Sequence, residues 1–195
     1  MIKLGNTKIV LASKSPRRHE LLKTLGVDFK IVDLDIDESY DTHLKGKEIT
    51  DYLAEKKARA YRISQDSELI ITADTIVWFD GKALEKPKDR NEAFAMLRSL
   101  SGNKHQVYSS VAIRSNEILE ITNDTTDVYF KNLSDLEIDY YLDNFQYNDK
   151  AGSYGIQDWF GLTCVNRIEG CYYNVMGLPT KKLYNLLSKF SSQIK

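Results

Sequence analysis

The 195-residue chain has only two cysteines, Cys164 and Cys171, and only three histidines. The cysteines stand seven residues apart without a CxxC pair or a Cys/His cluster, which argues against a zinc site. No apolar run approaches the length that spans a bilayer. The residues that follow Met1 are too polar for the apolar segment of a signal peptide. We therefore expect a cytoplasmic protein with no membrane partner.

The sequence also lacks an excess of charge of either sign. Lys and Arg number 27 and Asp and Glu number 28, so the formal net charge is −1. Proteins that bind nucleic-acid polymers depend on an excess of positive charge to neutralise phosphates, so no such partner is expected. The motifs GxSxG, Walker A, GxGxxG and HExxH are absent too, which weakens several enzyme classes.

The hydrophobic pattern that remains predicts one domain over residues 1–195, with no linker inside it. Apolar runs predict strands at 8–13, 29–32, 68–73 continuing through 76–79, 106–114, 118–130 and 162–168. Helical spacing predicts a helix over 49–63 and helices that start at Ser15-Pro16, at Asp89, at Ser134 and at Pro179. Ser15 can cap the first of these helices, Asp89 with Glu92 forms a capping-box pattern, and Ser134 with Glu137 caps another helix. Because hairpin signals interrupt the alternation, we expect an α/β fold with a mixed sheet flanked by helices.

Polar residues follow the first predicted strand, where Ser13, Arg17 and Arg18 surround the start of a helix. A helix N-terminus offers free N–H groups and a positive dipole end to an anion. Arginine side chains suit phosphate oxygens. The competing interpretation is an exposed basic turn that only begins a helix.

Two parts of the sequence contain carboxylates that could bind a metal or act in catalysis. Asp74 ends a buried strand and could bind a metal or act as a general base, although it could also cap the next turn. Asp37 and Glu38 end an acidic stretch and could bind Mg²⁺, or could belong to a solvated loop. Lys57 and Lys86 would complete a triphosphate site only if these segments converge; singly, each would be a surface residue.

Seven segments in order resemble the Maf family of nucleotide pyrophosphatases from about residue 9 to about residue 190. They are ASKSPRR at 12–18, LAEKKA at 53–58, ADT at 73–75, EKP at 85–87, LSG at 100–102 with His105 and Val107, DKAGSYGIQ at 149–157 and NVMGLP at 174–179. The resemblance implies an elongated α/β fold of two lobes with a deep cleft, related to the inosine-triphosphate pyrophosphatase architecture. It also implies a homodimer.

The resemblance further implies hydrolysis of a nucleoside triphosphate to the monophosphate and pyrophosphate with Mg²⁺ or Mn²⁺. It makes Asp74 the catalytic carboxylate and, with Glu38, a metal ligand. The phosphate-binding candidates are Ser13, Arg17, Arg18, Lys57 and Lys86.

The resemblance also bears on the choice of base, because the branch of the family that acts on dTTP and UTP carries Ile-Gln where this chain has Ile156 and Gln157. We expect Gln157 to contact the base. An amide both donates and accepts, which matches the O4 and N3–H groups of uracil and thymine. Trp159 or Phe160 could stack on a base or pack the core or a dimer contact. Two alternatives stay open: a non-catalytic nucleotide-binding regulator of septum formation, and the same reaction on purine nucleotides such as ITP.

Overall fold

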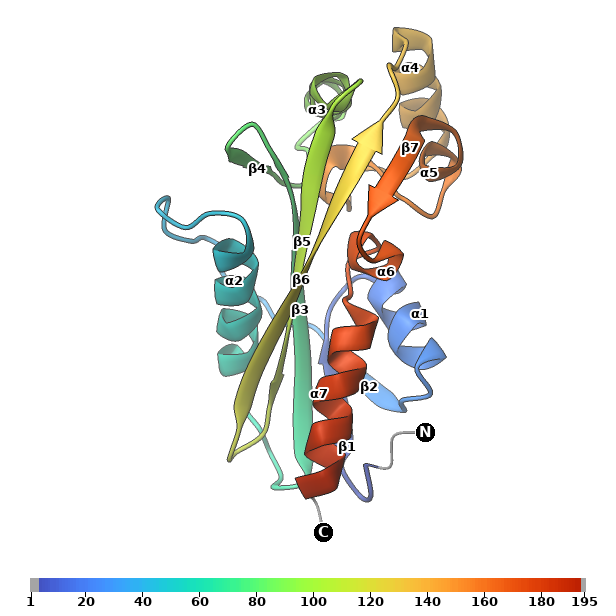
Figure 1. The fold of residues 1–195 in the computed structure, drawn as a ribbon. Coiled ribbons are helices and arrows are strands. Elements are labelled where there is room, and N and C mark those ends of the chain that lie inside the picture. The colour runs from blue at the N-terminus through green and yellow to red at the C-terminus, as the bar shows by residue number, and fades with distance from the viewer. Residues whose placement is uncertain (1–3, 194–195) are drawn as a thin grey trace.

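One mixed sheet of seven strands forms the frame of the protein (Figure 1). The structure is a computed structural model, and it describes residues 4–193. The strands are β1 (Lys8–Ala12), β2 (Phe29–Val32), β3 (Glu68–Phe79), β4 (Lys82–Leu84), β5 (Lys104–Arg114), β6 (Leu119–Phe130) and β7 (Val165–Glu169). Their order is β2-β1-β3-β5-β6-β7, and β4 pairs with β3 outside this row. The β1 pairings are parallel, whereas all the others are antiparallel.

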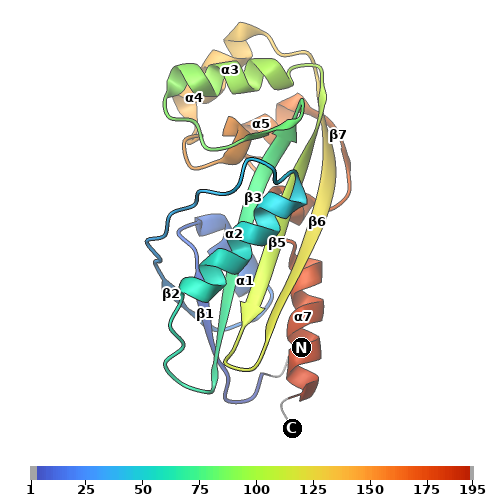
Figure 2. The same cartoon turned by 90° about the vertical axis from the view of Figure 1, so that its left-hand side faces the viewer.

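Helices cover both faces of this sheet and one of its ends. They are α1 (Pro16–Thr24), α2 (Lys47–Ala60), α3 (Arg90–Leu100), α4 (Asp135–Asn144), α5 (Trp159–Cys164), α6 (Tyr172–Val175), α7 (Thr180–Gln193) and the short 3-10 helix η1 (Ala151–Ser153). The helix α2 lies against one face and α7 against the other, whereas α3, α4 and α5 gather at one end (Figures 1 and 2). Among residues 4–193, no helix has both the length and the apolar character needed to cross a membrane.

The two largest hydrophobic clusters define two lobes of the fold. In the first lobe, residues of β1, α1 and α7 pack together, with Leu11, Leu22 and Leu187 fully buried. In the second lobe, α3, α4 and α5 pack around Leu97 and Phe160. The long strands β3 and β5 contribute to both cores. The prediction of a mixed, elongated sheet flanked by helices is confirmed.

The end of β1 determines where polar side chains collect. β1 runs parallel to β3, and its last residue, Ala12, lies opposite Thr72. The chain leaves the sheet at Ser13, whereas β3 continues to Phe79. Ser13 and Asp74 therefore lie at the carboxyl edge of β1, the place where open α/β sheets bind ligands.

One predicted element is wrong. The segment predicted as a strand at 162–168 begins inside the helix α5, and β7 starts only at Val165. The Asp158 carboxylate accepts the N–H of Phe160 at 3.1 Å and caps α5, while the Phe160 side chain is fully buried. A helix of six residues shows too little periodicity to be told from a strand. The helix predicted over 49–63 is α2, at Lys47–Ala60.

The capping box expected at the start of α4 is present. The Ser134 hydroxyl accepts the N–H of Glu137, and the Glu137 carboxylate accepts the N–H of Ser134 at 2.9 Å. The hydrogen bond from Lys131 and those from Ser134 lower the pKa of Glu137 to about 2. The charged form of Glu137 therefore stabilises this end of α4.

Replacing Ser134 by Ala is expected to lower the free energy of unfolding by about 1 kcal/mol, because the N–H of Glu137 loses its acceptor. Urea unfolding at pH 7 measures this difference. The Glu137 pKa is depressed in the folded state, so its contribution is complete above its ordinary value of 4.5 and is lost as the pH falls toward about 2. The hydrogen bonds link Ser134 to the charge of Glu137, so the difference in free energy of unfolding between Ser134→Ala and the parent should change over this pH range. A constant difference would contradict this link.

Candidate active site

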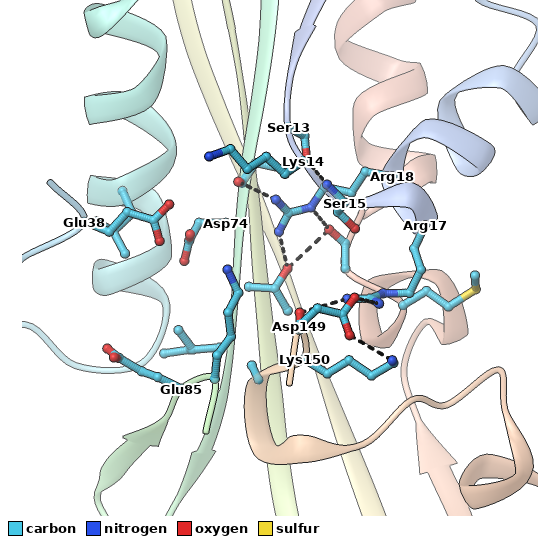
Figure 3. A pocket seen from close by; sticks show the side chains of 18 of the residues that line it. Ser13, Lys14, Ser15, Arg17, Arg18, Glu38, Asp74, Glu85, Asp149 and Lys150 are labelled. Atoms are coloured by element: carbon cyan, nitrogen blue, oxygen red, sulfur yellow. Dashed lines mark hydrogen bonds and ion pairs between the residues drawn. The ribbon is translucent and has the colours of Figure 1, made fainter. Parts of the chain in front are cut away.

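A cavity of about 480 Å³ is lined by residues of both lobes (Figure 3). Its walls come from the β1–α1 turn, the acidic loop after β2, helix α2, the middle of β3, the segment after β4, and the turns around η1 and α6. All eight predicted site residues line it: Ser13, Arg17, Arg18, Glu38, Lys57, Asp74, Lys86 and Gln157. The convergence that the sequence could not establish is thus present, while the role of each residue stays a prediction.

The β1–α1 turn presents an open helix N-terminus to the cavity. Ser15 is the N-cap residue of α1, but in the described chain its side chain makes no capping hydrogen bond. Ser15 therefore stands at the predicted N-cap position, but its side chain does not cap the helix. The Ser13 hydroxyl instead accepts the N–H of Ser15 at 3.2 Å. The first-turn N–H groups thus remain without a side-chain cap and can bind an anion.

The two adjacent arginines of α1 have different surroundings. Arg18 donates from Nε to Gly177 O at 2.8 Å, from Nη1 to Ala73 O at 2.8 Å and from Nη2 to Thr75 Oγ1 at 3.0 Å. Burial lowers the pKa of the Arg18 guanidinium, and the Asp74 carboxylate opposes this shift. Arg18 thus contacts the backbone before Asp74 and the side chain after it, and two of its five N–H groups are left for a ligand.

Arg17 points to another wall of the cavity (Figure 3). Its Nη1 atom lies 2.7 Å from Oδ2 of Asp149, in the turn that leads into η1. The Arg17 side chain is about one-fifth exposed, so it is accessible to a ligand. One arginine therefore contacts β3, while its neighbour contacts the opposite side of the cavity.

An ammonium group between two carboxylates occupies the α2 side of the cavity. Lys57 Nζ lies 2.7 Å from Oδ1 of Asp74 and 3.1 Å from Oε1 of Glu38. The Asp74 and Lys57 side chains are almost buried, whereas that of Glu38 is half-exposed. Partial burial acts to raise the pKa of Glu38, but the positive charges of Lys57, Lys86 and Arg18 outweigh it and lower that pKa.

This donor set fits a hard divalent cation that also binds phosphate. No group of three or more His, Cys, Asp or Glu side chains suited to a metal occurs among residues 4–193. Mg²⁺ commonly uses one or two protein carboxylates and takes its other ligands from water and substrate phosphates. Glu38 and Asp74 could supply those carboxylates, and they lie where the protein already stabilises a positive charge.

The segment after β4 contributes one acidic and one basic residue to the cavity lining, Glu85 and Lys86. Glu85 Oε1 accepts a hydrogen bond from the Tyr40 hydroxyl at 2.8 Å. Partial burial and this carboxylate raise the pKa of Tyr40 to about 12. Within residues 4–193, Lys86 has neither a hydrogen bond nor an ion pair through its ammonium group. Its positive charge is therefore available to an anionic ligand.

Gln157 lines the cavity and is exposed, whereas the aromatic residues after it are not part of the wall. Phe160 packs against Phe130 and Tyr141, and Trp159 packs against the second-lobe core. Of the interpretations of these aromatic residues, packing in the core is therefore the one that the structure supports.

Several residues in the cavity lining were assigned no role from the sequence, among them Thr75, Glu85, Asp149, Lys150 and Gly177. Each of these five lies in a segment that matches a family motif, which was the only available signal. Most of them have partners in other segments, as Gly177 has in Arg18, so no spacing along the chain predicts these contacts.

Comparison with known proteins gives these features a family. The family model described as Maf-like protein matches residues 8–190. The chain belongs to the Maf family. It is 52% identical over 191 residues to a dTTP/UTP pyrophosphatase of Bacteroides thetaiotaomicron, covering 95% of this chain and 99% of that one. It is 48% identical over 187 residues to a dTTP/UTP pyrophosphatase of Flavobacterium johnsoniae, covering 95% and 96%.

A solved structure supports the fold independently. The Ham1 protein of Staphylococcus aureus matches with a TM-score of 0.51, covering 97% of this chain and 100% of that one. The sequence identity is only 15%, so this likeness concerns the fold alone. It agrees with the mixed α/β fold described above.

Proposed function

We propose that this Maf family member hydrolyses dTTP and UTP to the nucleoside monophosphate and pyrophosphate. The observation that carries the proposal is the convergence of carboxylates and cationic side chains from separate segments on one cavity. A volume of about 480 Å³ falls in the range of small-molecule sites. Relatives about half identical over nearly the whole chain bear the name dTTP/UTP pyrophosphatase.

The phosphate chain would be bound by the open N-terminus of α1 with Ser13, Arg17 and Arg18, and by Lys86 on the facing wall. Backbone N–H groups and guanidinium groups bind phosphate oxygens directly and remain positively polarised through the reaction. In this arrangement, positive charge lies where the departing pyrophosphate gains negative charge.

Asp74 would act as the general base. Lys57 hydrogen-bonds to Oδ1 of Asp74, which leaves Oδ2 for a water molecule. The water oxygen forms a bond to the α-phosphorus as its proton passes to Asp74, and the bond from that phosphorus to the α,β-bridging oxygen breaks. The electron pair of the broken bond leaves with pyrophosphate. Lys57 keeps the carboxylate oriented towards the cavity.

Mg²⁺ or Mn²⁺ would be held by Glu38 and Asp74. When bound, a divalent cation neutralises phosphate charge and polarises the phosphoryl group. The Glu38 side chain is half-exposed, so its carboxylate would be accessible to such a cation.

A panel of nucleoside triphosphates with Mg²⁺ or Mn²⁺ tests the reaction, scored for pyrophosphate against orthophosphate. We expect dTTP and UTP to be cut fastest, with pyrophosphate as the first product. Orthophosphate as the first product would contradict cleavage between the α- and β-phosphates. Saturable binding without turnover would favour a nucleotide-binding regulator, and a preference for ITP would favour the purine alternative.

We further propose that Gln157 reads the pyrimidine base. Replacing Gln157 by Glu should lower kcat/KM for dTTP and UTP by about tenfold, because a carboxylate cannot donate to O4 and repels it. The rate with 7-methyl-GTP should fall less or rise, since a carboxylate suits the N–H donors of guanine. Gln65→Glu, outside the cavity, is the matched control. Unchanged preferences in Gln157→Glu would remove Gln157 as the base reader.

A further inference from the structure

The Asp149–Lys150 pair belongs to a family motif, yet the proposed reaction gives it no task. The Asp149 carboxylate lies between two cations: Oδ1 is 2.9 Å from Lys150 Nζ, and Oδ2 is 2.7 Å from Arg17 Nη1. A second contact joins Arg17 Nη2 to the Asp149 backbone oxygen at 3.4 Å. All three residues line the cavity (Figure 3).

The Lys150 side of this triad is rigid. The Lys150 side chain is only 8% exposed, and its ammonium group also donates to the backbone oxygen of Gln146. One oxygen of Asp149 is therefore fixed by a buried group that belongs to the same turn. The other oxygen is presented to Arg17, whose side chain is more exposed.

The turn itself is fixed to the central sheet. Gly152 donates its N–H to Glu85 O at 3.2 Å, at the end of the β3–β4 hairpin. Gly152 has a φ of +66°, and a Cβ atom there would lie 2.8 Å from a methyl group of Val77. Only glycine fits both the backbone conformation and the space. The turn that carries Asp149 therefore cannot easily move relative to β3.

The Arg17–Asp149 contact joins the two lobes across the cavity. Arg17 belongs to α1, which packs in the first-lobe core, whereas the turn before η1 adjoins the second-lobe core. A free arginine side chain loses conformational entropy when a ligand immobilises it. An arginine that the protein already holds loses less, and so binds phosphate better.

We propose that Asp149, fixed by Lys150, is a positioning residue that holds the Arg17 guanidinium in place for the phosphate chain of the substrate. This inference rests on the proposed function, because it takes Arg17 as a phosphate ligand. Asp149 itself contacts no phosphate, since its negative charge would repel it. Its effect on the reaction passes entirely through Arg17.

A double-mutant cycle of Asp149→Asn and Arg17→Gln tests this dependence. We expect Asp149→Asn to raise KM for dTTP by about tenfold with a smaller change in kcat, since an uncharged partner holds the guanidinium less firmly. Arg17→Gln should raise KM further, and adding Asp149→Asn to it should change little. If the KM of the double variant instead rises by the product of the two single-variant fold-changes, Asp149 acts independently of Arg17, which would overturn the proposal.

Two controls make the cycle decisive. Asp143→Asn removes the same charge from an exposed ion pair with Arg90, outside the cavity, and should leave KM unchanged. Thermal unfolding of every variant identifies any loss of folding, and Asp149→Ser provides a second substitution if the asparagine variant unfolds. An equal rise in KM for Asp143→Asn would attribute the effect to net charge and overturn the proposal.

The same cycle measured on the affinity for inorganic tripolyphosphate by calorimetry separates this inference from the proposed function. This probe needs no turnover. Coupling between Asp149 and Arg17 in binding, in a protein that does not hydrolyse dTTP or UTP, would retain the positioning role and refute the proposed reaction. If the enzyme hydrolyses dTTP and UTP but the two substitutions affect tripolyphosphate binding independently, the proposed reaction would stand and the positioning role would be refuted.

Discussion

Replacing Asp74 by Asn is expected to lower kcat for dTTP and UTP by about 10³-fold, while nucleotide affinity changes by less than about threefold. An amide cannot accept the proton of the attacking water. Its oxygen can still accept the hydrogen bond that Lys57 now donates to Asp74 Oδ1 at 2.7 Å. The geometry of the site should therefore survive although the base is lost.

Steady-state kinetics and direct titration of nucleotide binding separate these two effects. The control is Asp80→Asn, at the exposed hairpin where β3 ends. Asp80 has a φ of 50°, which Asn tolerates well, so this variant should fold and turn over normally. Normal hydrolysis by Asp74→Asn would remove Asp74 as the base. A large loss of affinity in Asp74→Asn would make it mainly a binding residue.

Local signals predicted those parts of the fold that local interactions determine. Ser134 and Asp89 were expected to cap helices, and both accept an N–H from the first turn of their helix. The helix α5 was missed because tertiary packing of Phe160 in the second-lobe core determines it. Ser15 was expected to cap α1 by its residue type, but Ser13 takes the N–H of Ser15.

The location of the candidate site was predictable only through motifs, because its residues are spread from Ser13 to Gln157. The sheet order brings Ser13 beside Asp74, since β1 and β3 are neighbours. Contacts such as Arg17 with Asp149 link residues 132 positions apart. They depend on the conformation of a turn that no periodicity describes. Family motifs could therefore identify the candidate site residues, whereas only the structure could show which of these residues contact one another.

The hydrogen bonds of Arg18 to the protein backbone are the basis of the second prediction with a large expected effect. β1 ends at Ala12 opposite Thr72, and β4 pairs with β3 only from Val77, so among the described residues β3 has no strand neighbour on that side between Ala73 and Ile76. The Arg18 guanidinium donates to Ala73 O and so takes the place of the missing strand, while it also binds Gly177 O. The backbone next to Asp74 is thereby fixed to the start of α1 and to the turn after α6.

Replacing Arg18 by Lys should lower kcat by about 10²-fold and the free energy of unfolding by about 3 kcal/mol. One ammonium group cannot reach three acceptors on two segments, and each buried acceptor left unpaired costs about 1–3 kcal/mol. The matched control is Arg17→Lys on the same helix, where an ammonium group can still pair with Asp149. That variant should lose far less stability.

Urea unfolding and kcat, measured on both lysine variants, distinguish two roles for Arg18. A loss of kcat together with stability means that Arg18 positions Asp74 through the backbone at Ala73. If Arg18→Lys instead loses activity at unchanged stability, its two remaining N–H groups act mainly on phosphate. Equal losses in Arg17→Lys and Arg18→Lys would contradict the distinction between the two arginines. The three protein contacts of Arg18 against the single carboxylate partner of Arg17 favour the positioning role.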